Sequence, residues 1–529
     1  MKKLKELPIG VQTFKKMREN NYVYVDKTEH VYNLATKQGV FFLSRPRRFG
    51  KSLLISTFKE LFEGNKKLFN GLWIEDKWNW SDKRPVIQLS FANMGYRTLG
   101  LEKAILYELK ELATTHGITF STESYSLQFR ELIQKLYAQY GKVVILIDEY
   151  DKPIIDYLEK GGIEQAKENQ AIVKNFYSVI KDAENYIQFL FITGVSKFAK
   201  VSIFSDLNHL SDLTLNKNYA TITGYTQAEL EANFEDYIQL TMEDLELSRE
   251  TLLAMMKKWY DGFSWDGKNY LYNPFGTLNF FDNGVFKNYW FTTGLPTFLI
   301  KLMKEKGVYE FESQKITDVA LEKYDIENLD ITSLMFQTGY LTVKELDSMT
   351  GDLVLDYPNQ EVRDGVYQFL IDDLTRTPKS TTSSHITVKN LGKAFKDNDL
   401  AQVKLIINTL FADLPNQLFS TDKEDKKREL ALSERFFHSI IHLVFKYLNI
   451  FIDSEVSTSI GRADSVVQTA THIYIFEFKY NRSGNAAMTQ LIKNNYADKY
   501  RASGKKIVGI GVNFKHDTRQ INGWIVKDL

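Results

Sequence analysis

The chain has 529 residues, of which 43% are hydrophobic and 14% aromatic, enough to bury the cores of three or four domains. Lysine plus arginine equal aspartate plus glutamate at 67 each, so the net charge favours neither nucleic-acid binding nor membrane binding. The absence of cysteine excludes disulfides and thiolate metal sites. No apolar run follows the first residues or exceeds strand length, so we expect a soluble, cytoplasmic protein with no membrane span.

A phosphate-binding loop is the feature around which the rest of the chain is organised. Residues 39–44 have the short, apolar, aromatic-rich pattern of a buried strand, and residues 52–62 carry apolar side chains at helical spacing. Between them, Gly50 lets the backbone approach a phosphate, Lys51 neutralises phosphate oxygens, and Ser52 offers a hydroxyl to Mg²⁺. The order of strand, tight loop and helix therefore predicts a nucleotide site.

The loop departs from the usual pattern at its start. The motif G-x-x-x-x-G-K-[ST] would put its first glycine at Arg45, so only the second half of the signature is present. On the tripeptide Gly-Lys-Ser alone, an ordinary strand-to-helix turn is an equally good interpretation. Arg47 and Arg48 lie in the same loop. They act either across a subunit interface of a homo-oligomer or on the phosphates of their own subunit, and the sequence leaves both roles open.

A parallel α/β sheet is predicted by strands that alternate with helices over about 220 residues. The predicted strands are 22–28, 86–91, 143–147, 187–193 and 219–222, and the predicted helices include 101–113 and 129–140. Five consecutive large aliphatic residues at 143–147 indicate a strand that is buried on both faces of such a sheet.

Acidic residues follow this buried strand, at the edge of the sheet where ligands bind. We predict that Asp148 holds Mg²⁺ through water, that Glu149 orients or deprotonates the attacking water, and that Thr193 on the next strand senses the γ-phosphate. The alternative, a solvated Asp-Glu pair that caps a strand, would require two coincidences in the correct order. We therefore expect ATP and Mg²⁺ as cofactors.

Three segments together resemble the bacterial AAA-ATPase-like family: residues 24–28, 44–52 and 146–153. In that family arginine stands where the first loop glycine would be, as Arg45 does here. The extra strand at 86–91 is similar to that of the additional-strand ATPases, in which the glutamate beside the Walker-B aspartate activates water. The resemblance covers roughly residues 5–225 and implies an ATPase domain, which we place at residues 1–225.

Two segments are expected to follow the ATPase domain. Residues 226–313 are mostly helical, and we interpret their dense aromatic residues as the core of a lid domain rather than as a stacking surface for nucleic acid. Residues 314–376 show helices followed by a hairpin, which suggests a winged-helix-like segment. Acidic residues surround this hairpin, so we expect it to transmit motion rather than to contact phosphates.

Residues 375–384 are the clearest linker, and a further domain is predicted over 377–529, with its core at about 430–529. Its amphipathic stretch at 430–448 carries Glu434, His438 and His442 at intervals of four residues. This spacing could hold a metal, but no fourth ligand accompanies it, so surface or boundary histidines are the preferred interpretation.

A second constellation of charged residues lies in this C-terminal domain. In the predicted strand at 473–479, alternate residues share a face, so Glu477 and Lys479 point together. A hairpin brings Asp464 beside them, and two carboxylates with waters suit Mg²⁺ or Mn²⁺. Lys479 would then position the attacking water and stabilise the charged transition state. In a chain that is 25% charged, the bare spacing alone leaves chance as the better explanation.

The same stretch resembles the core of a PD-(D/E)XK nuclease, with Ala463 in place of the usual proline. The resemblance implies that Glu455 is the upstream metal-binding acid and that Gln490, on the following helix, is an accessory residue. The strand at 506–512 completes the expected order of elements. A nuclease-like domain commonly follows the ATPase in the AAA-ATPase-like family, so the two resemblances support each other.

The sequence thus predicts an α/β multidomain chain with a P-loop parallel-sheet ATPase core, a helical lid, a winged-helix-like segment and a C-terminal restriction-endonuclease-like domain. We expect an ATP-hydrolysing protein that controls a metal-dependent nuclease, with DNA favoured over RNA as the partner. The alternative is a nucleotide-switched binding or signalling protein that holds nucleic acid or a partner without cutting. A role in defence against mobile DNA rests on analogy of architecture.

Overall fold

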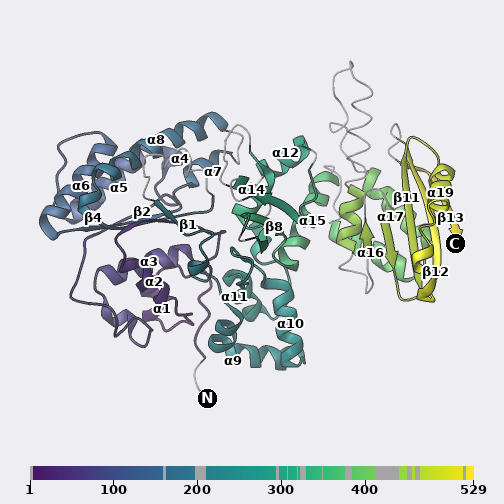
Figure 1. Cartoon of the computed structure of the whole chain (residues 1–529), viewed down its shortest axis with the longest axis horizontal. Coiled ribbons are helices and arrows are strands. Elements are labelled where there is room, and N and C mark those ends of the chain that lie inside the picture. The colour runs from purple at the N-terminus through teal and green to yellow at the C-terminus, as the bar shows by residue number, and fades with distance from the viewer. Residues whose placement is uncertain are drawn as a thin grey trace. The chain divides into compact units, whose positions relative to one another are not determined.

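The computed structural model divides the chain into two compact units (Figure 1). The first comprises Met1–Leu302 and Glu310–Arg363, and the second Met303–Tyr309 and Asp364–Leu529. The residues described are 4–158, 162–196, 210–293, 297–306, 308–317, 320–321, 329–347, 349–375, 384–412, 440–448, 456–458, 465–515 and 520–529. The division into four domains that the sequence suggests stays a prediction.

A five-stranded parallel sheet forms the centre of the first unit. Its strands are β1 (Gly39–Ser44), β2 (Val86–Ser90), β3 (Val143–Asp148), β4 (Ile187–Gly194) and β5 (Leu210–Asp212), in the order β2-β3-β4-β1-β5. The strand that lies between the loop strand β1 and the acidic strand β3 is therefore β4. From the sequence we compared the strand at 86–91, which is β2, with the extra strand of the additional-strand ATPases. The structure places β2 at the edge of the sheet instead, and β4 holds the inserted position.

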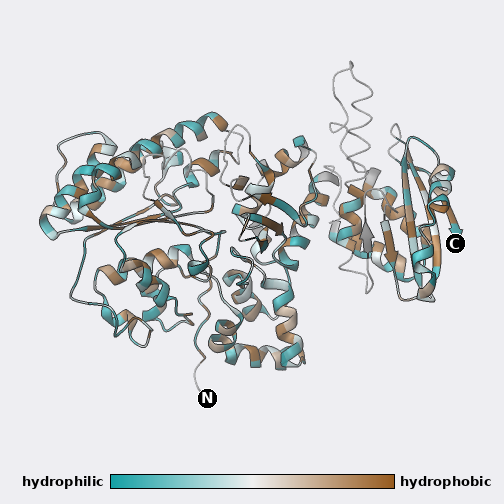
Figure 2. Cartoon of the chain, viewed as in Figure 1, coloured by the Kyte–Doolittle hydropathy of each residue, from teal (hydrophilic) through white to brown (hydrophobic). Residues whose placement is uncertain are grey.

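Helices cover both faces of this sheet (Figure 1). One face carries α4 (Tyr96–Leu99), α5 (Leu101–Thr115), α6 (Tyr125–Tyr140), α7 (Lys152–Leu158) and α8 (Ile163–Asp182), and the other carries α1 (Phe14–Glu19), α2 (Thr28–Ala35) and α3 (Lys51–Phe62). Alternate strand residues enter different cores: Phe42 and Ile145 belong to one cluster, and Phe41 and Val144 to the other. The central strands β1, β3 and β4 are consequently apolar along most of their length, as Figure 2 shows.

Two strands predicted from the sequence are wrong. Residues 22–27 form no strand, and Thr28 begins α2. Val23 and Val25 are buried among the lid residues, so their alternation reflects packing without a partner strand. The segment at 219–222 contains the end of a 3-10 helix, η3 (Lys217–Tyr219), and β5 precedes it.

The lid of the first unit consists of α9 (Gln227–Leu245), α10 (Arg249–Tyr260) and α11 (Pro274–Asn283). Thr226, Ser248 and Asn273 cap these three helices by accepting a backbone N–H. Most of the aromatic residues between α10 and α11 pack into the interior, as we interpreted them: Phe263, Trp265 and Tyr272 are buried, whereas Tyr270 is exposed.

A three-stranded antiparallel sheet follows the lid, in the order β6-β8-β7. Its strands are β6 (Gln314–Thr317), β7 (Thr342–Leu346) and β8 (Asp352–Asp356). The 3-10 helix η4 (Trp290–Thr293) and the helices α12 (Thr297–Lys306), α14 (Ile331–Thr338) and α15 (Gln360–Thr375) complete the region. Helix α14 followed by the hairpin β7–β8 gives the winged-helix-like segment.

The second unit is an α/β layer structure around a sheet in the order β13-β12-β11-β10-β9. The strands are β9 (Val456–Thr458), β10 (Ser465–Gln468), β11 (His472–Tyr480), β12 (Lys506–Lys515) and β13 (Gln520–Asp528), and the helices α16 (Ser384–Lys396), α17 (Leu400–Ala412) and α19 (Gly484–Lys493) accompany them. Among the described strands of this sheet, only β11 and β12 pair in parallel. The edge strand β13 was not predicted.

The two faces of β11 pack against different helices. Phe395 of α16 contacts the ring of Phe476 on one face, whereas Ile475 packs with Leu491 of α19 on the other. The predicted linker at 375–384 falls largely outside the described residues. No helix in the described part of the chain is long and apolar enough to span a bilayer.

Candidate nucleotide site and nuclease-like site

The predicted phosphate-binding loop joins β1 to α3. Gly50 has φ 85°, in the left-handed region that favours glycine, and α3 begins at Lys51. No side chain caps the N-terminus of α3, so its first backbone N–H groups are available to an anion. The geometry is that of a strand-loop-helix anion site.

The ammonium group of Lys51 is held inside this loop. Its Nζ donates to the carbonyl oxygens of Arg45 and Pro46, at 2.9 Å each, which occupies two of its three N–H donors. Burial lowers the pKa of Lys51, and the carboxylates of Asp148 and Glu149 oppose this shift. The Lys51 ammonium therefore lies between the loop and the acidic residues Asp148 and Glu149.

The acidic motif lies at the end of β3, where the sequence placed it. Thr193 on β4 donates its hydroxyl to Asp148 Oδ1 at 2.6 Å, and both side chains are buried. The structure thus brings together the two residues that we expected on neighbouring strands. Their roles as magnesium ligand and γ-phosphate sensor stay predictions.

Glu149 turns away from the strand direction with φ 52°. Burial raises its pKa, and Lys152, whose Nζ lies 3.8 Å from Glu149 Oε2, opposes the shift. A carboxyl group with a raised pKa beside a phosphate loop is suited to orient a water molecule or to accept a proton from it.

Asp151 is a buried residue to which sequence reasoning gave no role. Its Oδ2 accepts the backbone N–H of Val195 at 3.0 Å and both the N–H and the hydroxyl of Ser196, at 2.6 and 2.7 Å. These bonds tie the acidic segment to the chain that leaves β4. A Cβ at Gly194 would lie 2.4 Å from the Tyr150 ring, so a side chain there would push the two apart. In the sequence, the Thr-Gly pair at 193–194 could have indicated that the chain after β4 packs closely against the acidic segment.

Of these groups, Lys51 and Glu149 border a pocket of about 500 Å³, within the range of about 300–1,000 Å³ usual for ligand sites. Its lining combines charged or polar groups with apolar side chains. The charged and polar part of the lining includes Arg47, Arg48, Gly50, Lys51, Ser52 and Glu149. The apolar part includes Val11, Val23, Val25, Ile222, Tyr225 and Leu278. This mixed lining suits a ligand that has both an anionic and an apolar part.

Arg47 and Arg48 are exposed and belong to the wall of this pocket in their own chain. The carbonyl oxygen of Arg47 accepts the indole N–H of Trp290 at 3.0 Å. The guanidinium of Arg48 lies 5.2 Å from the ring centre of Phe275, at the start of α11. The loop is thus in direct contact with the lid.

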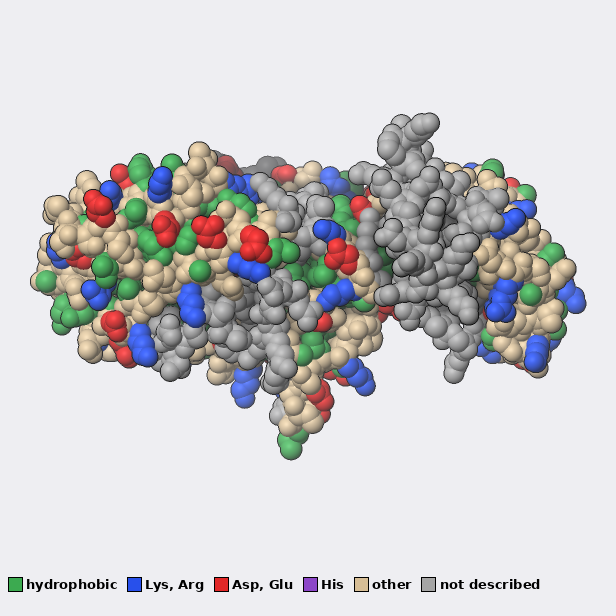
Figure 3. Space-filling view, turned by 90° about the horizontal axis from the view of Figure 1, so that it is seen from above, with side chains coloured by type: hydrophobic (Ala, Val, Ile, Leu, Met, Phe, Trp, Pro, Cys, Tyr) green, Lys and Arg blue, Asp and Glu red, His purple; other side chains and the backbone are tan. Residues whose placement is uncertain are grey.

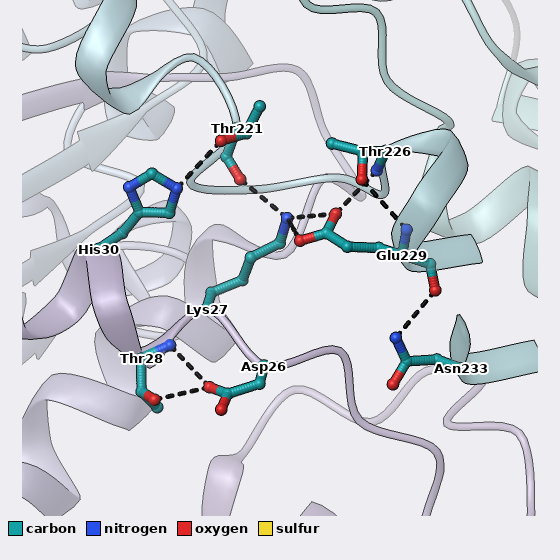
Figure 4. A network of polar contacts seen from close by, with 8 residues as sticks. All are labelled: Asp26, Lys27, Thr28, His30, Thr221, Thr226, Glu229 and Asn233. Carbon is teal, nitrogen blue, oxygen red and sulfur yellow. Dashed lines mark hydrogen bonds and ion pairs between the residues drawn. The ribbon is translucent and has the colours of Figure 1, made fainter. Parts of the chain in front are cut away.

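A polar network at one wall of the pocket joins the N-terminal segment to the lid (Figure 4). Lys27 donates to both carboxylate oxygens of Glu229, at 2.6 and 2.7 Å, and to the carbonyl of Thr221 at 2.9 Å. Glu229 also forms the capping box of α9 with Thr226. Burial lowers the pKa of Lys27, and Glu229 opposes this. The spacing Thr226-x-x-Glu229 was a sequence signal for this cap that we did not use.

The nuclease-like site is centred on β11. Lys479 Nζ lies 2.7 Å from Glu477 Oε1, and Glu477 is almost completely buried. The rings of Phe476 and Phe478 stack on the opposite face, with centres 5.6 Å apart. The structure therefore places the Glu-x-Lys pair on one face of the strand, as the alternation predicted.

Glycines bring α19 against this face. A Cβ at Gly511, which pairs with Glu477 across the strands, would lie 2.6 Å from the carbonyl oxygen of Gly484. The start of α19 consequently lies on the backbone of the sheet beside the Glu-x-Lys pair. Gln490, the expected accessory residue, lies on this helix and is half-buried.

Most of the remaining predicted ligands lie outside the described residues. Glu455 and Asp464 lie outside the described residues, as do Glu434 and His438 of the histidine spacing. His442 lies within the helical residues 440–448. In the part of the chain that is described, no three His, Cys, Asp or Glu side chains cluster in a way that could hold a metal ion.

Comparison with known proteins agrees with this organisation. Residues 8–204 match the family model of predicted AAA-ATPases, and residues 432–524 match that of the PD-(D/E)XK nuclease superfamily. An uncharacterized protein in the vnfD 5' region of Azotobacter chroococcum mcd 1 is 37% identical over 534 residues, which cover 99% of each chain. The chain belongs to the AAA-ATPase-like family.

Two solved structures of Aeropyrum pernix proteins show a weaker likeness to this family member. The ORC2 protein is 9% identical, and the match covers 80% of this chain and 92% of that one. The ORC1 protein in complex with DNA is 12% identical, with 66% and 93% covered. Both have a TM-score of 0.26, too low to establish a shared arrangement of domains.

Proposed function

We propose that the chain binds and hydrolyses ATP in its first unit and that this activity controls nucleic-acid cleavage by its C-terminal domain. The observation that carries the proposal is the convergence of Lys51, Glu149 and the bonded pair Asp148–Thr193 at one end of β1, β3 and β4. Phosphoryl transfer needs these three kinds of group: a phosphate cation, a metal-holding acid and a group that acts on water.

The pocket residues fit a magnesium nucleotide. Arg47, Arg48, Gly50 and Lys51 would bind the phosphates, because they supply cations and backbone N–H groups to the lining of the pocket. Ser52 and Asp148 would hold Mg²⁺, which neutralises phosphate charge when it is bound. The apolar side chains of the lining would contact the base.

The water-directed roles fall to two residues. Glu149 would orient or deprotonate the attacking water, in keeping with its raised pKa. Thr193 would hold Asp148 in place through the bond between them and so respond to the γ-phosphate.

In the C-terminal domain, Glu477 would hold a divalent metal together with Asp464 and Glu455, and Lys479 would position water and balance negative charge. The pairing of Glu477 with Lys479 fits this role, since the lysine ammonium lies 2.7 Å from one oxygen of the buried carboxyl group. A metal supplies an activated water for attack on a phosphodiester. Gln490 would assist from α19.

We assign the nucleic-acid contact to this C-terminal domain, with DNA as the favoured substrate. On the face of the first unit seen in Figure 3, over α5, α6 and α8, acidic and basic side chains are mixed. Such a surface does not attract a polyanion by its charge. A homo-oligomer is compatible with the loop arginines but is not required by them.

The test is cleavage of single- and double-stranded DNA and RNA in Mg²⁺ and in Mn²⁺, with and without ATP. Glu477→Gln should abolish cleavage, whereas Asp528→Asn, a control at an exposed acid of the same unit, should not. Lys51→Ala should abolish ATP binding, whereas Lys66→Ala at an exposed position should not. Cleavage that survives Glu477→Gln would contradict the nuclease mechanism.

The second candidate is a nucleotide switch that binds nucleic acid or a partner without cutting. The acidic hairpin residues Asp352 and Asp356 favour transmission of motion over phosphate contact by this segment, which suits a switch. Tight, salt-sensitive binding without cleavage in either metal would support it.

A further inference from the structure

Arg45 occupies the position of the missing loop glycine, yet its side chain turns into the protein. It is completely buried, and its Nη1 donates to the carbonyl oxygens of Ser44 and Thr214, at 2.8 and 3.0 Å. Its Nη2 donates to the carbonyl of Tyr219 at 3.2 Å. Burial lowers the pKa of Arg45 to about 9, so the guanidinium is charged at neutral pH. A buried cation of this kind is not placed to bind phosphate.

The guanidinium instead lies on an aromatic ring of the lid. Its Cζ is 3.9 Å from the ring centre of Trp265, which is itself buried. Phe49, in the same loop, packs its ring edge-on against Trp265 with centres 5.4 Å apart. We call Arg45, Phe49 and Trp265 the loop–lid clamp. In this clamp, two residues of the loop, Arg45 and Phe49, contact the same side chain, that of Trp265.

The position of Trp265 is fixed from behind. The neighbouring Ser264 donates its N–H to Thr342 Oγ1 at 2.6 Å, and its carbonyl accepts the hydroxyl of Thr342 at 2.8 Å. Thr342 is the first residue of β7. The backbone next to Trp265 is therefore tied to the first strand of the winged-helix-like segment.

The backbone of Arg45 connects the clamp to the phosphate site. Its carbonyl accepts one of the two bonds made by Lys51, and its N–H donates to the carbonyl of Gly194, next to Thr193. A phosphate that draws the ammonium of Lys51 toward itself must weaken the bond to this carbonyl. Any shift of the Arg45 peptide is passed to a side chain that stacks on Trp265.

We propose that Arg45 is a positioning residue for the phosphate loop and that the loop–lid clamp couples nucleotide binding at Lys51 to the lid through Trp265. This inference rests on the proposed ATP binding. It explains why arginine is tolerated where a glycine would normally allow the turn: the loop is held by the lid rather than by its own tight geometry. Arg45 itself touches no nucleotide.

A spectroscopic test uses the full chain labelled with 5-fluorotryptophan and titrated with ATP and Mg²⁺. The ¹⁹F resonance of Trp265, assigned by its absence in Trp265→Phe, should shift on saturation. Trp73 is the internal control, because it too lies beneath a cation, Lys77 at 4.5 Å, but does not border the pocket. Its resonance should stay in place. A Trp265 resonance unchanged at saturating ATP would overturn the proposal.

Binding measurements on variants provide the second test. Arg45→Lys keeps the charge but loses the planar fork, and Trp265→Leu removes the ring, so each should raise the Kd for ATP by about tenfold. The double variant should be no weaker than either single one, because both remove the same contact. The matched control Trp73→Leu should leave the Kd within about twofold. An additive double variant would overturn the coupling.

The outcomes separate this inference from the proposed function. If the natural chain does not bind ATP, the proposed function has failed. If it binds ATP and both single variants bind equally well, only the clamp has failed. Should Arg45→Lys not fold, Trp265→Phe retains a weaker aromatic face and should raise the Kd by about two- to threefold in a folded chain. No change in that variant would count against the clamp.

Discussion

The bond between Thr193 and Asp148 provides the sharpest test of the nucleotide site. Replacing Thr193 with valine keeps the shape of the side chain and removes only its hydroxyl. The O–H···O distance is 2.6 Å and both side chains are buried, so this is a charge-assisted bond worth about 1.5–3 kcal/mol. We expect Thr193→Val to lower the free energy of unfolding of the first unit by that amount.

The same substitution should slow ATP hydrolysis more than it weakens ATP binding. Asp148 would lose the group that holds its Oδ1, and each 1.4 kcal/mol of transition-state stabilisation corresponds to about tenfold in rate. A fall of about 10- to 100-fold in kcat follows, while the Kd for ATP should change little, because Lys51 and the α3 N-terminus are untouched.

Urea unfolding followed by tryptophan emission reports on this unit, since Trp524 is the one of seven tryptophans outside it. Thr193→Ser is the matched control: it keeps the hydroxyl and loses a methyl group, at a cost of about 1 kcal/mol. Equal destabilisation by valine and serine, or full turnover in the valine variant, would refute the assigned bond.

Three further changes test other parts of the chain. Glu149→Gln should still bind ATP but lose at least about 100-fold in turnover, measured by phosphate release. Glu361 is buried and its pKa is raised from 4.5 to about 8, so the unfolded chain loses this proton first as the pH rises. Stability should therefore fall by about 1.4 kcal/mol per pH unit in this window, and urea unfolding of Glu361→Gln should lack that slope. Gly511→Ala should cost at least about 1–3 kcal/mol, seen as a lower midpoint for the second unit, because its Cβ would meet backbone atoms of α19.

Periodicity predicted the parallel sheet because a strand buried on both faces leaves a distinct run of apolar residues. It failed at Val23 and Val25, whose side chains alternate in the same way but pack against the lid without a partner strand. Hydrogen-bond partners, not side-chain pattern, define a strand, and a single sequence does not contain them. The spatial order of the strands was likewise hidden, and β2 was taken for the strand that is in fact β4.

The site was predictable where its residues are neighbours in sequence or share a strand face. Lys51 follows Gly50, and Glu477 precedes Lys479 by two, so local geometry alone places them. The contact of Arg45 with Trp265 joins residues 220 positions apart and depends on how the lid packs. Nothing in the local pattern around either residue indicates it. The contact of Lys27 with Glu229 was equally hidden, although the capping-box spacing of Thr226 and Glu229 did indicate a structural role for Glu229.

The insertion of β4 between the loop strand and the acidic strand has a direct mechanical consequence. The carbonyl of Gly194 accepts the N–H of Arg45 on one side, and Thr193 donates to Asp148 on the other. The two residues that follow β4 donate to Asp151. The loop and the acidic segment of the proposed nucleotide site are therefore both hydrogen-bonded to the end of the same strand. We therefore expect a ligand that displaces either the loop or the acids to alter hydrogen bonds at the end of β4, so that a change in one half of the proposed site would reach the other half through this strand end.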